Sequence, residues 1–149
     1  MAIWQFDFMI IPQIRDIKDY NDNNNYMSWH GIKIPEDSLE FLSIHLPIGK
    51  SWSNDIRQYG DKDSTCIEIY MLDNDIDEIR CRFDLRNISK SLLENVISFI
   101  NIINGKVYIN GKSYKADIPS IIELVRESDA ARFCKSPIDY FKYLDNTSK

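Results

Sequence analysis

The chain has 149 residues, of which 44% are apolar and 28% are charged, and its formal net charge is -5. This composition is typical of a globular protein and excludes an intrinsically disordered chain, and the length predicts one domain over residues 1–149. The negative charge repels phosphate backbones, so we expect no nucleic-acid partner.

The opening residues "MAIWQFDFMII" lack a basic segment followed by an uninterrupted apolar run, because Asp7 interrupts it. We therefore expect no secretory signal. No stretch approaches the roughly 18 apolar residues that span a bilayer, which predicts a cytoplasmic protein without a membrane partner. Cys66, Cys81 and Cys134 are widely spaced and form no zinc-binding pattern, so we expect reduced, buried thiols and no metal.

The first elements along the chain are a strand, a loop and a short helix. Residues 3–11 are rich in strand-forming side chains, and Pro12 is expected to end the strand. Asn, Asp and Gly in residues 20–33 predict a loop. Residues 35–47 begin with Pro and acidic residues, as helices do, and predict a short helix. The polar residues 48–65 predict a long connection.

Residues 66–85 give the clearest hairpin, because apolar and polar residues alternate on both sides of residues 73–75. A three-residue loop predicts four cross-strand pairs: Leu72 with Ile76, Tyr70 with Glu78, Glu68 with Arg80, and Cys66 with Arg82. In this register Cys66 and Cys81 point to opposite faces, which argues against a disulfide between them.

Residues 91–105 predict an amphipathic helix with a wide apolar face. Ser91 and Glu94 have the spacing of a capping box at its beginning, and Gly105 is expected to end it. The pair Asn110 and Gly111 then predicts a tight turn between two short strands.

The last part of the sequence predicts three short helices. Asp117 is expected to cap the first of them, residues 127–133 form a further turn or two, and Ser136 and Pro137 begin the last. Together the elements predict an α+β fold with a mostly antiparallel sheet of about five strands and helices packed on one face.

The predicted hairpin carries a row of charged and polar residues on one face. Three interpretations are open: a solvated surface that discourages aggregation, a partner-binding face, or an internal salt-bridge network in which Arg82 or Arg86 holds a loop carboxylate. The candidate partner-binding residues on this face are Glu68, Tyr70, Glu78, Arg80 and Arg82.

The preceding loop supplies the other candidate partner-binding residues: Trp52, Asp55, Tyr59, Asp61 and Asp63. We expect Trp52 to fill the edge of the core. The alternative is an aromatic anchor with an acidic rim, which suits a basic partner. Asp61 and Asp63 lack the calcium-binding loop pattern and are not expected to bind a metal.

The sequence contains no recognisable catalytic motif, and we expect no catalytic residues and no cofactor. His30 and His45 are the two histidines, and neither lies in a nucleophile motif or beside a glycine-rich phosphate loop. A catalytic triad assembled from distant residues stays open at this point.

Several segments resemble a family of small, acidic, stand-alone bacterial proteins that is itself uncharacterised. The resemblance rests on the opening "WQFDF", on "LPIGKSWSNDIRQYGDKDSTCIEIY", on "RFDLR" at residues 82–86, on "SDAARF" at residues 128–133 and on "PIDYF" at residues 137–141. Proteins of this size and charge are similar to the immunity proteins of polymorphic toxin systems. The resemblance implies a role in neutralising a toxin.

The sequence therefore favours a protein-binding module, of the immunity type that neutralises a bacterial toxin domain. A small hydrolase with a dispersed site around Trp52, Asp61, Asp63 and the arginine strand is the first alternative. The second is a scaffold subunit that pairs with itself through a sheet edge. The oligomeric state is left open.

Overall fold

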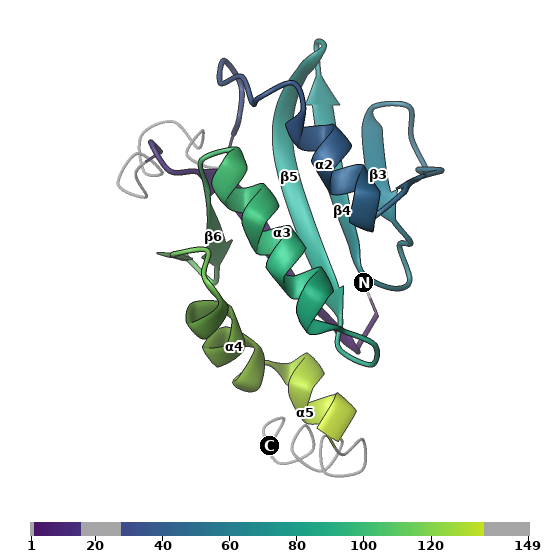
Figure 1. Ribbon diagram of the computed structural model, residues 1–149, viewed down its shortest axis with the longest axis vertical. Coiled ribbons are helices and arrows are strands. Elements are labelled where there is room, and N and C mark those ends of the chain that lie inside the picture. Colours follow the sequence, from purple (N-terminus) through teal and green to yellow (C-terminus); the bar gives the residue numbers. More distant parts are fainter. Residues whose placement is uncertain (1, 16–27, 136–149) are drawn as a thin grey trace, which may run out of the picture.

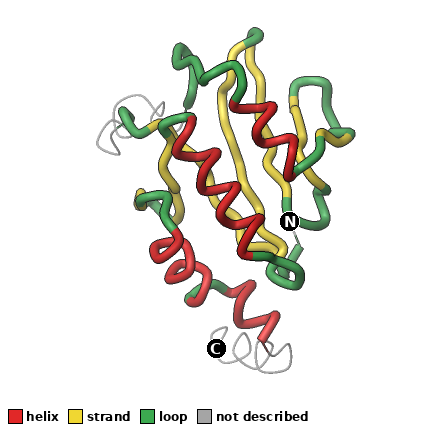
Figure 2. Tube along the Cα trace, in the orientation of Figure 1, coloured by secondary structure: helices red, strands yellow, loops and turns green. Residues whose placement is uncertain are grey.

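The computed structural model describes residues 2–15 and 28–135, which form one antiparallel sheet with helices packed on one face (Figures 1 and 2). The predicted α+β class is therefore confirmed, although the sheet has seven strands in place of about five. Among the described residues, no helix is both long and apolar enough to cross a membrane.

The sheet has the order β2-β3-β4-β5-β1-β6-β7, and every neighbouring pair is antiparallel. The first of these strands in the chain, β1, lies inside the sheet, between β5 and β6. The bounds are β1 Gln5–Pro12, β2 Ile48–Gly49, β3 Ile56–Gly60, β4 Cys66–Leu72, β5 Asp75–Asp84, β6 Gly105–Ile109 and β7 Lys112–Tyr114.

The β4–β5 hairpin has the predicted register over most of its length, with Glu68 opposite Arg80, Tyr70 opposite Glu78 and Cys66 opposite Arg82. The predicted pair of Leu72 with Ile76 is wrong, because Leu72 lies opposite Asp75. The turn contains only Asp73 and Asn74, both with positive φ, and a bulge after Tyr70 takes up the extra residue.

Strands β2 and β3 lie within the segment that the sequence predicts as a connection. Strand β3 has only five residues, and its apolar Ile56 and Tyr59 are three positions apart, so no alternation of apolar and polar residues marks it as a strand. Strand β2 is a two-residue edge strand that pairs with β3, and both of its residues are exposed. These two strands account for the difference in strand number.

Four helices are described: α2 Ser38–His45, α3 Lys90–Ile102, α4 Ile118–Arg126 and α5 Asp129–Lys135. The predicted capping box of α3 is wrong, because Ser89, and not Ser91, accepts the cap hydrogen bond from the Leu92 amide. Asn104, with a φ of 57°, ends the helix, whereas Gly105 already belongs to β6.

The remaining local predictions are confirmed where the structure describes them. Asn110 and Gly111 form the β6–β7 turn with positive φ, and Asp117 caps α4 by accepting a hydrogen bond from the Ser120 amide at 2.8 Å. The helix predicted from Ser136 lies outside the described residues, as do residues 20–27 of the predicted loop.

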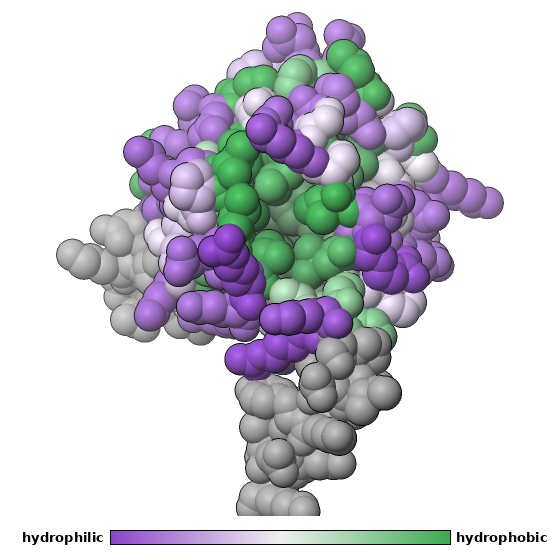
Figure 3. Space-filling view, turned by 60° about the horizontal axis from the view of Figure 1, so that its bottom comes forward, coloured by the Kyte–Doolittle hydropathy of each residue, from purple (hydrophilic) through white to green (hydrophobic). Residues whose placement is uncertain are grey.

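The core lies between the sheet and the helices α2 and α3. Cys81 is buried on this side and Cys66 on the other, and both thiols are free, as predicted. Cys134 is also free, but it is only partly buried, so the prediction of a buried thiol is wrong for this residue. Apolar side chains also reach the surface: Figure 3 shows a group of them surrounded by hydrophilic residues, and Ile102 of α3 and Ile122 of α4 are among the exposed apolar residues. The opposite face of the sheet is polar.

Candidate protein-binding face

The sheet register gathers polar side chains on the face opposite the helices. Residues that lie directly opposite each other on antiparallel strands point to the same side of a sheet, so the pairs of β1, β3, β4 and β5 share one face. Gln5 and Asp84 lie at one end of it. We use the name polar face for the other seven: Asp7, Gln58, Glu68, Tyr70, Glu78, Arg80 and Arg82.

The centre of the polar face is an ion pair between Arg82 and Glu68. Arg82 Nη2 lies 2.8 Å from Glu68 Oε1, and the Glu68 side chain is only 2% exposed. Because a carboxylate loses most of its hydration at this depth, it depends on the nearby guanidinium for stabilisation. The stability of the folded state therefore depends on Arg82, because Arg82 neutralises the buried charge of Glu68.

Four buried side-chain atoms on the polar face have no hydrogen-bond partner among the described residues. They are two acceptors and two donors: Gln58 Oε1, Glu68 Oε1, Arg80 Nε and Arg82 Nε. The contact between Glu68 and Arg82 has the distance of an ion pair, but not the geometry of a hydrogen bond. These four atoms have almost no surface accessible to a molecule the size of water, so they lie beneath the polar face and not on its surface.

Arg80 lies beside this centre and is more accessible. Its Nη2 donates a hydrogen bond to Glu78 Oε2 at 3.4 Å, and its guanidinium carbon lies 5.5 Å from the ring centre of Tyr70. The arginine side chain is 42% exposed. Arg80 and Tyr70 thus present a guanidinium and a phenol ring together, which are the residue types enriched at protein interfaces.

Asp7 brings a carboxylate from the central strand to the same face, opposite Arg82. Burial raises the pKa of its carboxyl above the ordinary value, and the positive charges of Arg82 and Arg80 offset only part of this effect. A carboxylate that is disfavoured in the folded state indicates a residue kept for a reason other than stability.

We expect Asp7→Asn to stabilise the protein at neutral pH. Because the folded state raises the pKa of Asp7, the charged form lowers the free energy of unfolding, and the neutral amide removes this penalty. The advantage of the variant shrinks as the pH falls through the raised pKa of Asp7, because the wild-type carboxyl then becomes protonated. Urea unfolding at a series of pH values measures both effects.

Asp73→Asn in the exposed β4–β5 turn is the matched control, because it removes the same charge from a side chain that is not buried. Its stability is expected to follow the wild type across the same pH series. An Asp7→Asn variant that is less stable than the wild type at neutral pH contradicts the expectation.

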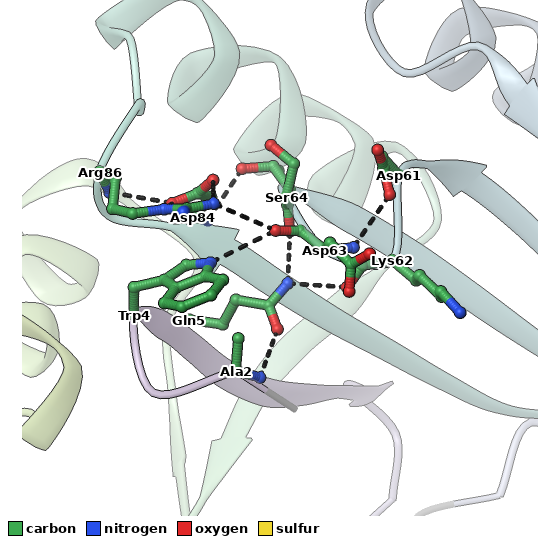
Figure 4. Close-up of polar contacts among 10 residues, drawn as sticks. Ala2, Trp4, Gln5, Asp61, Lys62, Asp63, Ser64, Asp84 and Arg86 are labelled. Carbon is green, nitrogen blue, oxygen red and sulfur yellow. Dashed lines mark hydrogen bonds and ion pairs between the residues drawn. The ribbon is translucent and has the colours of Figure 1, made fainter.

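The loop between β3 and β4 lies at one end of the polar face and is held by Gln5 of β1 (Figure 4). Gln5 Nε2 donates hydrogen bonds to the carbonyl oxygens of Lys62 and Ser64, and Gln5 Oε1 accepts one from the Ala2 amide. Within the loop, Asp61 Oδ1 accepts a hydrogen bond from the Asp63 amide at 3.0 Å. These bonds fix the backbone that carries the two exposed aspartates.

Arg86 holds the same loop from the other side (Figure 4). Its guanidinium makes two hydrogen bonds of 3.0 Å to the carboxylate of Asp84, lies 3.8 Å from the ring centre of Trp4, and donates to the carbonyl oxygen of Asp63 at 3.3 Å. The hydrogen bonds from Arg86 lower the pKa of Asp84. The loop is thus held through a carbonyl oxygen, and not through the carboxylate that the sequence suggests.

The structure corrects the expectation for Trp52, which is 73% exposed and does not fill the edge of the core. Tyr59 is buried on the helix side of the sheet and therefore cannot contact a partner as placed. Asp55 is exposed beside β3, and its backbone amide donates a hydrogen bond to Ser53 Oγ at 3.2 Å. Its carboxylate is therefore on the surface.

No family model, curated protein or solved structure matches this chain.

In residues 2–15 and 28–135, no group of three His, Cys, Asp or Glu residues could hold a metal ion. His30 lies 3.7 Å from Asp75 on the exposed surface. Burial raises the pKa of Cys66 to about 11, so that thiol is protonated at neutral pH.

Sequence reasoning missed two residues of the polar face and one that supports it. Asp7 and Gln58 belong to the face, and Gln5 holds the adjoining loop. Arg86, which also holds this loop, is one of the two arginines that the sequence suggests for such a role. The signal for Asp7 is present, since a charged residue interrupts an otherwise apolar strand. Gln58 gives no such signal, because its position depends on pairing between β3 and β4.

Proposed function

We propose that the protein is a binding module of the immunity type, which neutralises a toxin domain by covering part of its surface with the polar face. The observation that carries the proposal is the exposed Arg80 beside Tyr70 on this face, with the guanidinium carbon 5.5 Å from the centre of the phenol ring.

The chemistry of the Arg80 and Tyr70 side chains supports the same proposal. Arg80 and Tyr70 offer directed hydrogen bonds together with apolar area, which is the combination found in the residues that dominate binding energies. The net charge of -5 favours a basic partner, because opposite charge raises the rate of association. Many toxin domains that act on nucleic acids are expected to be basic for the same electrostatic reason.

The test begins with capture of a partner by the tagged protein from its own host. The captured protein is then expressed alone, where it is expected to arrest growth, and together with this protein, where growth is expected to return. Isothermal titration calorimetry of the purified pair gives the stoichiometry. A captured protein that causes no growth arrest contradicts the immunity role, and the absence of any stoichiometric complex contradicts the binding function.

Arg80→Ala locates the interface, and we expect it to weaken binding by at least tenfold, because exposed arginines at the centre of interfaces contribute large binding energies. The variant leaves Glu78 partly exposed to water, so the fold should be retained. Arg57→Ala is the matched control, since Arg57 is an exposed arginine of β3 on the opposite face. Equal affinity of the two variants would place the interface elsewhere.

A further inference from the structure

Strand β1 has a free edge along its first four residues. It pairs with β5 over residues 5–10, but with β6 only over residues 9–12. Strand β6 ends at Ile109, where a tight turn carries the chain away into β7. Among the strands that the structure describes, residues 5–8 of β1 therefore have a neighbour on one side only.

The backbone groups of Asp7 point toward this free edge. The Trp4 carbonyl oxygen accepts a hydrogen bond from the Leu85 amide on the side of β5, and the Gln13 amide donates to the Asn104 carbonyl oxygen on the side of β6. Because successive residues of a strand direct their N–H and C=O groups alternately to its two neighbours, those of Asp7 point to the side of β6. None of the described residues forms a hydrogen bond with the Asp7 amide or carbonyl oxygen.

A cavity of about 540 Å³ lies between this free edge and the end of β6. Gln5, Phe6 and Asp7 line it from β1, and Asn110 lines it from the β6–β7 turn. The segment that joins α4 to α5 lines it as well, and Figure 1 shows these helices below the end of β6. The cavity thus places open space beside backbone groups that have no partner.

Unpaired backbone groups beside an open space favour an added strand as the occupant. An extended segment antiparallel to β1 would place one residue opposite Asp7, and these two residues would exchange both of their backbone hydrogen bonds. Peptides that extend an existing sheet in this way gain affinity from such main-chain bonds. Four residues of a strand span roughly 13 Å, so the segment is short.

The charges around the cavity select a basic segment. The charged residues that line it are all acidic, namely Asp7, Glu127 and Asp129. Arg82 lies opposite Asp7 on β5, and Arg132 lies 3.4 Å from Asp129, whereas Glu127 is exposed and forms no ion pair with a described residue. Because no described lysine or arginine lines the cavity, it attracts a basic side chain and repels an acidic one.

The two faces of the sheet assign the side chains of such a segment. A residue opposite Asp7 has its side chain on the polar face beside the Asp7 carboxylate, so the basic residue is expected there. Its neighbours along the segment point to the helix side, where Phe6, Ile109 and Leu124 offer apolar surface to the cavity. The order expected in the occupant is therefore apolar, basic, apolar.

We propose that the free edge of β1 binds a short extended segment of a partner protein, which pairs with Asp7 as an added strand and places a lysine or arginine beside its carboxylate. The inference rests on the proposed function only in assigning the segment to a partner protein. Asp7 belongs to the polar face, so the added strand extends the proposed interface across β1.

Amide hydrogen exchange of the full chain tests whether the edge is free. The Asp7 amide should exchange at least about tenfold faster than the amides of Phe6 and Phe8, because alternation directs these two toward β5. An Asp7 amide as protected as those of its two neighbours would show that the chain itself covers the edge, and this result overturns the proposal.

The second experiment is a nuclear magnetic resonance titration with the peptide acetyl-Thr-Val-Lys-Val-Thr-amide, observed at the Asp7 and Asn110 backbone amides. We expect saturable shifts with a Kd on the order of 1 mM. The peptide with glutamate in place of lysine should bind roughly 2- to 10-fold more weakly, because like charges oppose each other across strands. A peptide with an N-methylated lysine should bind at least about 3-fold more weakly, since it cannot donate to the Asp7 carbonyl oxygen.

Asp7→Asn should reduce the preference for the lysine peptide over the glutamate peptide. Because this variant is expected to be more stable than the wild type, a reduced preference does not reflect unfolding. Asp73→Asn is the matched control and should keep the preference, because it removes the same charge from the exposed β4–β5 turn. The proposal is overturned if no saturable shift occurs at Asp7, if the N-methylated peptide binds equally well, or if Asp7→Asn keeps the full preference.

The two proposals fail in different ways. A partner complex that Arg80→Ala weakens, in a protein whose β1 edge binds no peptide, keeps the binding function and overturns the added strand. Binding of the lysine peptide at Asp7, in a protein that forms no partner complex, keeps the edge site and overturns the binding function.

Discussion

Arg82→Ala is expected to lower the free energy of unfolding by roughly 3 kcal/mol, because it leaves the buried carboxylate of Glu68 without an opposite charge. The loss of stability comes from the Glu68 carboxylate that remains. Without the Arg82 guanidinium, no attraction offsets the free energy that this carboxylate loses when folding removes its hydration. Urea unfolding followed by circular dichroism measures it.

Two variants separate this mechanism from a general effect of removing an arginine. Arg80→Ala, two residues earlier on the same strand, should cost less than about 1 kcal/mol, because its partner Glu78 is accessible to water. The double variant Arg82→Met with Glu68→Met should recover most of the lost stability, since no buried charge remains. If the double variant is no more stable than Arg82→Ala, the ion pair is not the cause.

Gly60→Ala is expected to destabilise the protein by roughly 2 to 5 kcal/mol. Gly60 has a φ of +87°, where a side chain is strained, and its Cβ would lie 2.3 Å from the Thr65 carbonyl oxygen. That oxygen belongs to the backbone at the beginning of β4, so it cannot move aside as the end of a flexible side chain would. Thermal or urea unfolding gives the change.

Gly111→Ala isolates the contribution of the backbone angle. Gly111 has a φ of +80°, close to that of Gly60, but nothing lies within 4 Å of the position of its Cβ. Its cost should therefore be only the conformational strain, roughly 1 to 2 kcal/mol. Equal losses at the two glycines would show that the close approach to Thr65 carries no cost of its own.

Local sequence signals predicted the elements whose residues alternate or repeat clearly. The β4–β5 hairpin and the α3 helix have such patterns, and the register of Glu68 with Arg80 follows from alternation alone. The length of the turn was harder to predict, because Asp73, Asn74 and Asp75 are all residue types that are common in turns. In the structure only Asp73 and Asn74 have the positive φ of turn residues. Errors at this level shift a boundary and leave the fold class intact.

The candidate site was less accessible to prediction, because it depends on contacts between distant segments. Gln58 joins the polar face only when β3 pairs with β4, and Trp52 is exposed because the short β2 strand carries its loop outward from the sheet edge. The polar side of Asp7 could be assigned only once β1 was placed beside β5. None of these pairings leaves a local pattern in the sequence.

The position of β1 inside the sheet also affects how the chain folds. Strand β1 precedes both of its neighbours in the chain, and β5 and β6 begin only at residues 75 and 105. During synthesis the apolar residues of β1 therefore stay unpaired until these distant segments have been made. Such distant pairing predicts slow folding and a period in which the emerging chain is prone to aggregation or suited to binding by a chaperone.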